Sequence, residues 1–512
     1  MSGVKAPEPA RRDGRDGRDG LDGLRPLSKS RITAGLQCLK RIHLETYDGA
    51  KREIEPGRRA ILEAGRLVGR VARDYFPGGV AIEYEGVPHD EAVRRTAAAL
   101  ADSATRAIYE GAFLHDGIRS RVDILVRTAG DRWNLVEVKS STGFKGEYLA
   151  DVAAQLHAVE GSGVTVDRIV LLHVNKQYLW DGGAYDITSL FAAHDLSEGV
   201  RSTVPKLLGR VREMRDVLAR PEPPPIPIGP HCRKPYPCPF HRHCHEVIPE
   251  HHVINLPRLT PKMYGTLIAA QVTDIRNIPD GFEGLSEFQW RVRDAVLRGE
   301  PFRHPGLQSE LRSLTFPIHF LDFETCNPAL PVIPGTRPFE QTPFQWSVHV
   351  LHEDGSHEHR GYLHRDRSDP REALAERLVE ALAEKGSIVV YSGFEARVIR
   401  YLADALPDLE EQLLPLQERI VDLLHLLHNY YYHPNFHGSF SIKDVLPVLV
   451  PTMSYDDLII REGSQAALAF IALTDPETVP GERAVLDQAL NAYCARDTMA
   501  LLCMYQVLRG MP

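Results

Sequence analysis

The stretch that decides the fold of the C-terminal half is Pro317-Ile318-His319-Phe320-Leu321-Asp322-Phe323-Glu324-Thr325. Its apolar run predicts a buried strand that ends in two carboxylates separated by one residue. Residues i and i+2 of a strand point to the same face, so Asp322 and Glu324 should emerge together. Two such charges repel each other unless a cation lies between them, and a divalent metal with oxygen ligands meets that need. An exposed strand end is the alternative interpretation of this pair taken alone.

Other acids of the C-terminal half fall where a metal site would need them. A buried strand predicted over 387–391 leads into a helix that begins with Phe394-Glu395. Near the end of the chain, Tyr493 and Asp497 are four residues apart on a predicted helix and therefore share one face. A tyrosine one turn before an aspartate can hold a water molecule that the metal then activates.

This arrangement is similar to that of the DEDD exonuclease superfamily, which has an RNase H-like fold. Asp322 and Glu324 match its first motif, and Tyr493-x-x-x-Asp497 matches its third motif in the tyrosine-bearing version. The second motif usually ends in Asp, whereas this chain offers Glu395, with Asp422 as a further acid. The resemblance implies 3′-to-5′ trimming of DNA or RNA with Mg²⁺ or Mn²⁺ held by Asp322, Glu324 and Asp497, and Glu395 and Tyr493 as further catalytic residues. Scattered surface acids are the alternative.

A segment between these motifs has the composition of a substrate-facing loop. Tyr430-Tyr431-Tyr432-His433-Pro434 is rich in aromatic residues, and Lys443 follows in a polar stretch. Aromatic rings can stack on bases and an ammonium group can contact a phosphate. We therefore expect Tyr431 and Lys443 to bind nucleic acid, although a tyrosine run is as often part of a core.

A second acid set lies in the N-terminal half. Asp123 ends the pattern Gly117-Ile-Arg-Ser-Arg-Val-Asp123, and Glu137-Val-Lys139 follows on the next predicted strand. Adjacent strands would bring Asp123 beside Glu137 to hold Mg²⁺ or Mn²⁺, while Lys139 orients water or steadies charge on the phosphate. Gln155, on the helix that follows, could help to place that water. A hairpin with solvated charges is the alternative.

The N-terminal pattern resembles the RecB-like branch of the PD-(D/E)xK nucleases, over roughly residues 28–245. Many relatives carry a histidine in a Gly-x-x-x-His pattern on an upstream helix. Here Gly65-Arg-Leu-Val-Gly69 has glycine in the place of that histidine, so a metal ligand is missing or Glu63 replaces it.

Four of the seven cysteines flank this nuclease-like segment: Cys38 precedes it, and Cys232, Cys238 and Cys244 follow it. This arrangement looks like the iron–sulfur staple of some RecB-like nucleases, which implies a [4Fe–4S] cluster held by four thiolates. The usual Cys-x-x-Cys step is absent, so Zn²⁺ is the competing interpretation, with the option of ligands from His231, His241, His243 or His245. Cys326, Cys494 and Cys503 fit no ligand spacing and are predicted core residues.

Composition sets the limits of these hypotheses. The chain has 512 residues, 43% of them hydrophobic, and a formal net charge of -9. We expect several α/β domains, no membrane association and a cytoplasmic location, because no apolar run is long enough to span a bilayer and no signal segment opens the chain. Nucleic-acid binding must use local basic patches, since the molecule is not basic overall.

The predicted architecture has four parts: a disordered tail (1–26), a RecB-like nuclease domain with the four-cysteine staple (27–250), a helical connector (251–315) and an RNase H-like exonuclease domain with a mixed sheet (316–512). This order resembles an uncharacterised bacterial family that fuses the two nuclease domains. The shared features are His231-Cys232, Tyr236-x-Cys238-Pro-Phe240, Leu321-Asp-Phe-Glu324 and Phe344-Gln-Trp346. The sequence thus predicts a metal-dependent nuclease acting on DNA or RNA, or a nucleic-acid-binding scaffold in which one or both centres are inactive.

Overall fold

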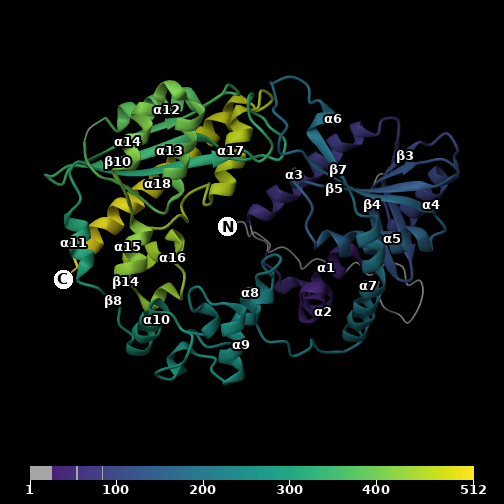
Figure 1. Ribbon diagram of the computed structural model, residues 1–512, viewed down its shortest axis with the longest axis horizontal. Helices are drawn as coiled ribbons and strands as arrows, with labels where there is room; N and C mark the ends of the chain where they lie inside the picture. The colour runs from purple at the N-terminus through teal and green to yellow at the C-terminus, as the bar shows by residue number, and fades with distance from the viewer. Residues whose placement is uncertain (1–25, 54–55, 83–84, 384, 512) are drawn as a thin grey trace, which may run out of the picture.

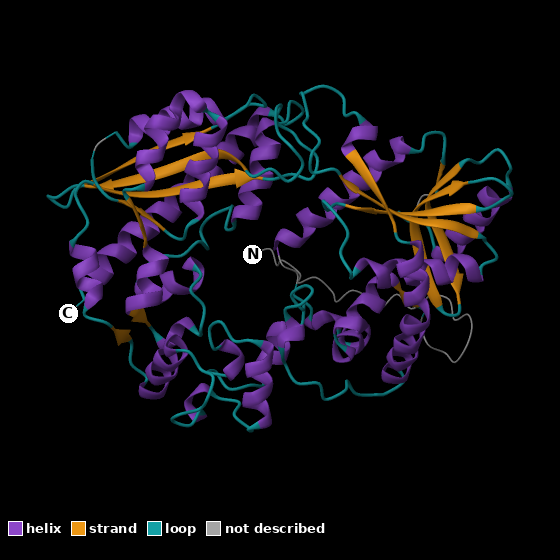
Figure 2. Ribbon diagram, viewed as in Figure 1, coloured by secondary structure: helices purple, strands orange, loops and turns teal. Residues whose placement is uncertain are grey.

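A computed structural model gives the structure of the chain and describes residues 26–53, 56–82, 85–383 and 385–511. The predicted disordered tail lies almost entirely outside these residues. Over the described residues the fold is mixed α/β, with two large sheets surrounded by helices and a small two-stranded sheet, β14-β8, apart from both (Figures 1 and 2). In the part of the chain that the structure describes, no helix combines the length and apolar character needed to cross a membrane.

The first sheet of the described residues has seven strands. Their order is β2-β3-β4-β5-β6-β7, and β1 pairs in parallel with β4. Strands β3, β4 and β5 form an antiparallel meander, because Asp116 and Gly117 both adopt the positive φ that a tight two-residue hairpin requires. The strands are β1 (Leu27–Ser28), β2 (Val80–Ala81), β3 (Ala107–His115), β4 (Ile118–Arg127), β5 (Trp133–Lys139), β6 (Val166–Val174) and β7 (Phe191–Asp195).

Helices cover both faces of this sheet. One face packs against the apolar side of α5, α7 and α1, and the other packs against α3. The helices of this half are α1 (Lys29–Gln37), α2 (Leu39–Tyr47), α3 (Pro56–Ala72), α4 (His89–Ala101), α5 (Tyr148–Gly161), α6 (Ile187–Leu190) and α7 (Ser197–Leu218), with short 3-10 turns η1 (Gly49–Lys51) and η2 (Arg73–Tyr75).

The second sheet has five strands among the described residues, in the order β11-β10-β9-β12-β13. Strands β9, β10 and β11 are antiparallel, whereas β12 runs parallel to both β9 and β13. The central strand β9 contains the stretch with Asp322 and Glu324. The strands are β9 (Ile318–Cys326), β10 (Thr342–Leu351), β11 (His357–Leu363), β12 (Ile388–Val390) and β13 (Ile420–Asp422).

Alternation along β9 assigns its side chains to two cores. Leu321 and Phe323 pack against α12, α13 and α14, whereas Phe320 packs on the opposite face with α15, α16 and α18. The helices are α12 (Arg371–Ala381), α13 (Phe394–Ala405), α14 (Glu410–Gln417), α15 (Leu423–Tyr430), α16 (Ile442–Leu449), α17 (Gly463–Thr474) and α18 (Pro480–Arg509), with 3-10 turns η6 (Pro407–Leu409) and η7 (Pro434–Phe436).

The segment between the sheets, called the connector from here on, begins before the predicted 251–315 and includes η3 and α8. It is mostly helical, and one apolar core joins it to the helices of the C-terminal half. Its short strand β8 (Phe302–Arg303) pairs with β14 (Tyr431–Tyr432). Its helices are α8 (His241–His245), α9 (Pro261–Ala269), α10 (Glu287–Arg298) and α11 (Gly306–Arg312), with 3-10 turns η3 (Pro230–Cys232), η4 (Val253–Asn255) and η5 (Ile275–Asn277).

The two halves also touch directly, on the side away from this connector (Figure 1). Ala329 and Leu330, which follow β9, pack into the core behind α3. The backbone N–H of Trp180 donates to the carbonyl of Thr336 at 3.1 Å, and the hydroxyl of Tyr185 donates to the carbonyl of Pro331 at 2.7 Å. The halves are therefore held together at two places, by the connector and by this contact.

Candidate active site

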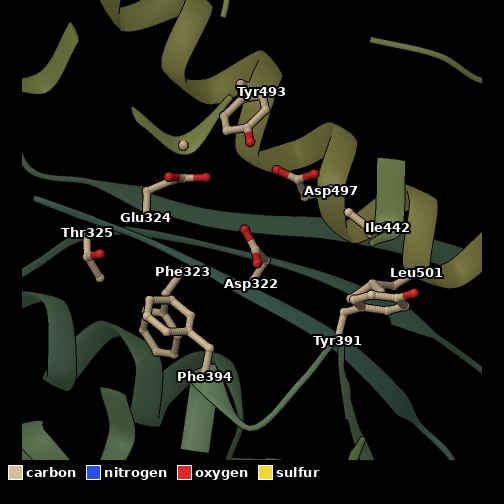
Figure 3. A pocket seen from close by; sticks show the side chains of 11 residues that line it. Asp322, Phe323, Glu324, Thr325, Tyr391, Phe394, Ile442, Tyr493, Asp497 and Leu501 are labelled. Atoms are coloured by element: carbon tan, nitrogen blue, oxygen red, sulfur yellow. The ribbon is translucent and has the colours of Figure 1, made fainter. Parts of the chain in front are cut away.

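Two carboxylates of β9 and one of α18 face a single cavity. Asp322, Glu324, Tyr493 and Asp497 all line it, with the Tyr493 hydroxyl directed toward the acids (Figure 3). The local rules of strand and helix explain the arrangement. Asp322 and Glu324 share the face of β9 that packs against α18, and Tyr493 and Asp497 lie one turn apart on that helix. The convergence predicted for these four residues is present.

A cysteine contributes to the same cluster. Asp322, Glu324 and Cys494 each offer a ligand atom, and the three atoms lie within 4.8 Å of one another. The Cys494 thiol donates to Asp322 Oδ2 at 3.9 Å. Cys494 is buried, as expected of a core residue, but its sulfur belongs to the site, which spacing along the sequence did not indicate.

Glu395 supplies a fourth carboxyl group. It lies in the first turn of α13, is 2% exposed, and its Oε2 has no hydrogen-bond partner. Its charge raises the pKa of both Asp322 and Glu324, so it acts on the same cluster. A buried carboxylate oxygen without a partner is costly, which indicates that a ligand normally satisfies it.

The electrostatics of these four acids point to a cation. Burial and the neighbouring carboxylates raise the pKa of Asp322 and of Glu324 well above their usual values. Burial raises the pKa of Glu395 to about 8 and that of Asp497 to about 6. Three buried acids and the half-buried Asp322, all with a raised pKa, are the donor set that a hard divalent cation would stabilise. The residues present therefore fit Mg²⁺ or Mn²⁺.

Two further side chains hold Asp497. The hydroxyl of Tyr455 donates to Asp497 Oδ1 at 2.5 Å, and hydrogen bonds from Tyr455 and Tyr493 both oppose the rise in the pKa of Asp497. The two tyrosine rings lie 6.1 Å apart. Tyr455 comes from the irregular segment between α16 and α17, and sequence reasoning missed it because no periodic pattern marks that segment.

The two residues predicted to bind nucleic acid differ in position. Lys443 lies on α16, where its charge lowers the pKa of Glu324 and of Asp497, so it faces the acid cluster. Its Nζ also donates to the carbonyl of Arg461 at 2.7 Å. Tyr431 is only 2% exposed, because β14 pairs with β8 and packs into the core. Its ring is not available to stack on a base, so that prediction is wrong.

Asp422, the other candidate for the second motif, has a structural task. It is the N-cap of α15, and one of its carboxylate oxygens accepts hydrogen bonds from the backbone N–H groups of Leu424 and His425. The same oxygen accepts from the N–H of Ser392. One of its two oxygens is thus occupied by the backbone, and its charge also raises the pKa of Glu395. Glu395, and not Asp422, is the acid whose charge raises the pKa of Asp322 and Glu324.

The N-terminal acid set also assembles. Strand β4 carries Asp123 and its neighbour β5 carries Glu137, in a register that places Ile124 opposite Val136. Glu137 Oε2 accepts a hydrogen bond from Gln155 on α5 at 2.6 Å, and Lys139 Nζ lies 2.7 Å from Glu137 Oε1. Asp123 Oδ2 accepts from the backbone N–H of Val138 at 2.7 Å. All four residues predicted for this centre therefore lie together.

A second lysine that the sequence did not indicate enters this centre. Lys29, at the start of α1, places its Nζ 2.5 Å from Glu137 Oε1 and 3.3 Å from Asp151 Oδ2. Burial on its own would raise the pKa of Glu137. The charges of Lys29 and Lys139 outweigh it and lower this pKa to about 2. Burial and the charge of Glu137 raise the pKa of Asp123 to about 7. Because two ammonium groups already neutralise Glu137, this donor set does not fit a metal ion as it is arranged.

The helix that should carry the missing histidine offers little in its place. Glu63, on α3, is exposed, and Gly69 has open space where a side chain would begin. Glu110 is a different acid near Asp123. On β3 and β4, Tyr109 pairs with Ile124 and Gly111 pairs with Val122, so Glu110 and Asp123 lie between the same two pairs. Glu110 has a φ of 58°. Its charge contributes to the raised pKa of Asp123. Its carboxylate lies 3.4 Å from Arg73.

The four predicted cysteine ligands line one small cavity. Cys38 lies between α1 and α2, and the other three come from the connector, so the cavity joins the two ends of the N-terminal half. Burial raises the pKa of Cys232 and Cys244 and brings that of Cys238 to about 11, so a cation would be needed to hold them as thiolates. The cavity therefore brings together the sulfur donors that a metal centre requires.

A histidine nitrogen lies beside the sulfur atoms of this cavity. His231 Nε2 is 3.6 Å from Cys232 Sγ. Among the residues described, no three possible ligands in this cavity come within 4.8 Å of one another.

A family model matches part of the C-terminal half of the chain. This model, described as a domain of unknown function (DUF2779), matches residues 319–441, a segment that contains Asp322, Glu324 and Glu395 but ends before Tyr493 and Asp497. No curated protein matches the chain. A solved structure titled "Crystal structure of SSO0001" is 12% identical, with a TM-score of 0.22, and the alignment covers 44% of this chain and 87% of that one.

Proposed function

We propose that the protein is a metal-dependent nuclease whose C-terminal centre hydrolyses phosphodiester bonds of DNA or RNA. The observation that carries the proposal is that Asp322, Glu324 and Asp497 line one cavity. The buried Glu395 acts on the same acids, because its charge raises the pKa of Asp322 and of Glu324. Lys443 opposes the charge of Glu324 and Asp497, Arg496 that of Asp497 and Arg397 that of Glu395, but burial outweighs them and the pKa of each acid stays raised. A site of this kind binds a divalent cation and, through it, a phosphate.

The layout of the second sheet supports the DEDD, RNase H-like interpretation. Three antiparallel strands are followed by two parallel ones, and the first acids lie on the central strand β9. Glu395 begins the helix after β12, and Asp497 lies on the last helix. This distribution over strand, middle helix and last helix is the one that the resemblance implies, and with it a 3′-to-5′ exonuclease.

The residues of this chain divide the chemistry among them. Asp322, Glu324, Glu395 and Asp497 would hold the cation, which on binding supplies an activated water and offsets charge on the phosphate. Tyr493 directs its hydroxyl into the cavity and can orient the attacking water (Figure 3). Tyr455 fixes the Asp497 carboxylate, and Lys443 supplies a positive charge for the substrate backbone.

Cleavage of end-labelled oligonucleotides tests the proposal. We expect Asp322→Ala and Asp497→Ala to abolish Mg²⁺- or Mn²⁺-dependent shortening from the 3′ end. Asp408→Ala, which changes an exposed acid on η6, should cleave at the wild-type rate. Unchanged cleavage by Asp322→Ala would refute the assignment. Running single-stranded and double-stranded DNA and RNA in parallel identifies the substrate class.

For the cysteine cavity we propose a [4Fe–4S] cluster that staples a RecB-like N-terminal domain. The cavity joins Cys38 to three cysteines about 200 residues later, so that four sulfur donors from the two ends of the N-terminal half line one space. Anaerobic purification followed by metal analysis should give about four iron atoms per chain and a brown protein. Stoichiometric zinc in a colourless protein would overturn this assignment without touching the C-terminal centre.

A second function has an observation in its favour. At the N-terminal centre, Lys29 and Lys139 both contact Glu137 and neutralise the acid that a metal would need. This supports the alternative in which the N-terminal half binds nucleic acid without cleaving it. Cleavage by a protein that carries Asp322→Ala and Asp497→Ala decides the matter, since any remaining metal-dependent activity must come from the N-terminal centre.

A further inference from the structure

The N-terminal centre contains a fixed positive charge among its acids. Lys29 Nζ is 2.5 Å from Glu137 Oε1 and 3.3 Å from Asp151 Oδ2, and its charge also acts on Asp123. Lys29 thus lies among the carboxylates that would have to share a metal ion. An ammonium group and a divalent cation compete when they need the same carboxylate oxygens.

Lys29 is held in this position by the fold. It is the first residue of α1, whose N-cap Ser28 accepts a hydrogen bond from the backbone N–H of Arg31. Leu27 and Ser28 form β1, which pairs with β4, the strand that carries Asp123. The segment that presents Lys29 is therefore attached directly to the strand that presents the acid.

The contacts of Glu137 leave little capacity for another cation. Its Oε1 accepts from Lys29 and from Lys139, at 2.5 and 2.7 Å. Its Oε2 accepts from the side-chain amide of Gln155 at 2.6 Å. Lys139 is also tied to Asp151, at 2.8 Å. A metal ion that reached Glu137 would have to displace at least one of these donors. Of the two lysines on Oε1, Lys29 is the less firmly held elsewhere, because its contact with Asp151 is 3.3 Å long and that of Lys139 is 2.8 Å.

We propose that Lys29 is the resident cation of the N-terminal centre, and that a divalent metal binds there only when the Lys29 ammonium group leaves Glu137. The inference rests on the proposed function only in taking Asp123 and Glu137 as the carboxylates of a nuclease-like centre. The proposal makes Lys29 a determinant of metal affinity. The (D/E)xK pattern accounts for one lysine in this centre, Lys139, whereas Lys29 is a second one.

Titration with Mn²⁺, followed by electron paramagnetic resonance of the free ion, tests the inference. The parent is the full-length protein with Asp322→Ala and Asp497→Ala, so that the C-terminal centre does not contribute. In this background Lys29→Met, which keeps the length of the side chain but removes its charge, should raise Mn²⁺ affinity at least tenfold. Lys29→Arg keeps the charge and should match the parent, as should Lys206→Met, which changes an exposed lysine on α7.

Each outcome has a distinct meaning. Equal or weaker Mn²⁺ binding by Lys29→Met overturns the inference but leaves the N-terminal metal centre in place. If neither the parent nor Lys29→Met binds Mn²⁺, the inference is overturned, and so is the assignment of Asp123 and Glu137 as metal ligands. Thermal melts provide a second readout if Lys29→Met is less stable. Mn²⁺ should raise its melting temperature more than that of the parent, and an equal response would count against competition.

Discussion

The two acid centres of this chain look alike in sequence but differ in how their charge is balanced. At the C-terminal centre, Glu324, Glu395 and Asp497 are buried beside the half-buried Asp322, and Lys443 is the lysine whose charge opposes those of Glu324 and Asp497. At the N-terminal centre, by contrast, Glu137 and Asp151 are paired directly with the ammonium groups of Lys29 and Lys139.

The pKa values show the consequence of this difference. Glu395 has its pKa raised to about 8, because burial penalises its charge, whereas Glu137 has its pKa lowered to about 2 by the two lysines despite burial. A bound cation would therefore stabilise the charge of Glu395, whereas the charge of Glu137 is already stabilised by two lysines. An Asp…Glu pattern therefore does not by itself identify a metal site, since the neighbouring cations decide whether one is needed.

The largest expected difference is in activity. Asp322→Asn removes a charged oxygen from the uncompensated cluster and should reduce metal-dependent cleavage by about a hundredfold or more. Asp123→Asn, the matching change at the compensated centre, should leave exonuclease activity within about threefold of the wild type, because Lys29 already occupies that centre. Initial rates on a 3′-labelled oligonucleotide measure both. A hundredfold loss in Asp123→Asn would mean that the two centres are equally dependent on metal.

The next effect is on stability. Glu137→Gln leaves Lys29 and Lys139 without their shared buried partner and should lower the free energy of unfolding by about 3 kcal/mol at pH 7. The lowered pKa of Glu137 gives the sign, because this stabilisation is present above pH about 4.5 and is lost only as the pH falls toward 2. Denaturant unfolding monitors the change. Glu160→Gln, which breaks an exposed pair with Arg201, should cost less than 1 kcal/mol.

At the C-terminal centre the corresponding substitution, Glu395→Gln, should raise the free energy of unfolding, whereas Glu137→Gln should lower it. Glu395 is easier to keep protonated in the folded chain, so metal-free protein should lose stability as the pH rises from about 4.5 to 8. Glu395→Gln mimics the protonated form and should be more stable than the wild type by about 1–3 kcal/mol at pH 8, with little difference at pH 4.5. Unfolding of chelator-treated protein at both pH values measures this.

Metal provides the control for that experiment. Saturating Mn²⁺ should stabilise the wild type at pH 8 and remove the advantage of Glu395→Gln, since the ion binds the charged carboxylate that glutamine lacks. An advantage that is the same at both pH values, or that persists in Mn²⁺, would show that Glu395 affects packing and not the charge of the cluster.

How far the sequence predicts these centres depends on the distance over which their residues are organised. Asp322 with Glu324, and Tyr493 with Asp497, obey the repeats of a strand and a helix, so their shared faces could be predicted. The pairing of β4 with β5 was also predictable, because a short turn joins them. Lys29 begins a helix, Tyr455 lies in an irregular segment, and Glu110 lies where the pairing of β3 with β4 is interrupted. Only the folded chain shows what these three residues contact.

Burial explains the prediction that failed. Tyr431 lies in an aromatic run next to Lys443, which favoured a surface that stacks bases. The connector strand β8 pairs with β14 and covers the ring, and pairing between strands more than 100 residues apart leaves no trace in local composition. Cys494 shows the opposite error. It was predicted to be only a core residue, but its sulfur atom lies beside Asp322 and Glu324 in the site.

The smallest expected effect concerns Tyr455, which holds Asp497 but lies outside the motifs. Its hydroxyl donates to Asp497 Oδ1, so Tyr455→Phe frees that carboxylate and should raise the pKa of Asp497 further above about 6. We expect a loss of about tenfold in cleavage at pH 7 that shrinks as the pH rises toward 9, where Asp497 ionises in either protein.

Tyr401→Phe is the matched control for that effect, because the Tyr401 hydroxyl also donates to a carboxylate, Glu340 Oε1 at 2.6 Å, away from the acid cluster. Its pH–rate profile should coincide with that of the wild type. If Tyr455→Phe lowers the rate by the same factor at every pH, Tyr455 supports the cavity only by packing. A recovery at high pH would instead mean that the uncompensated centre, unlike the N-terminal one, depends on hydrogen bonds to keep its acids ready for a cation.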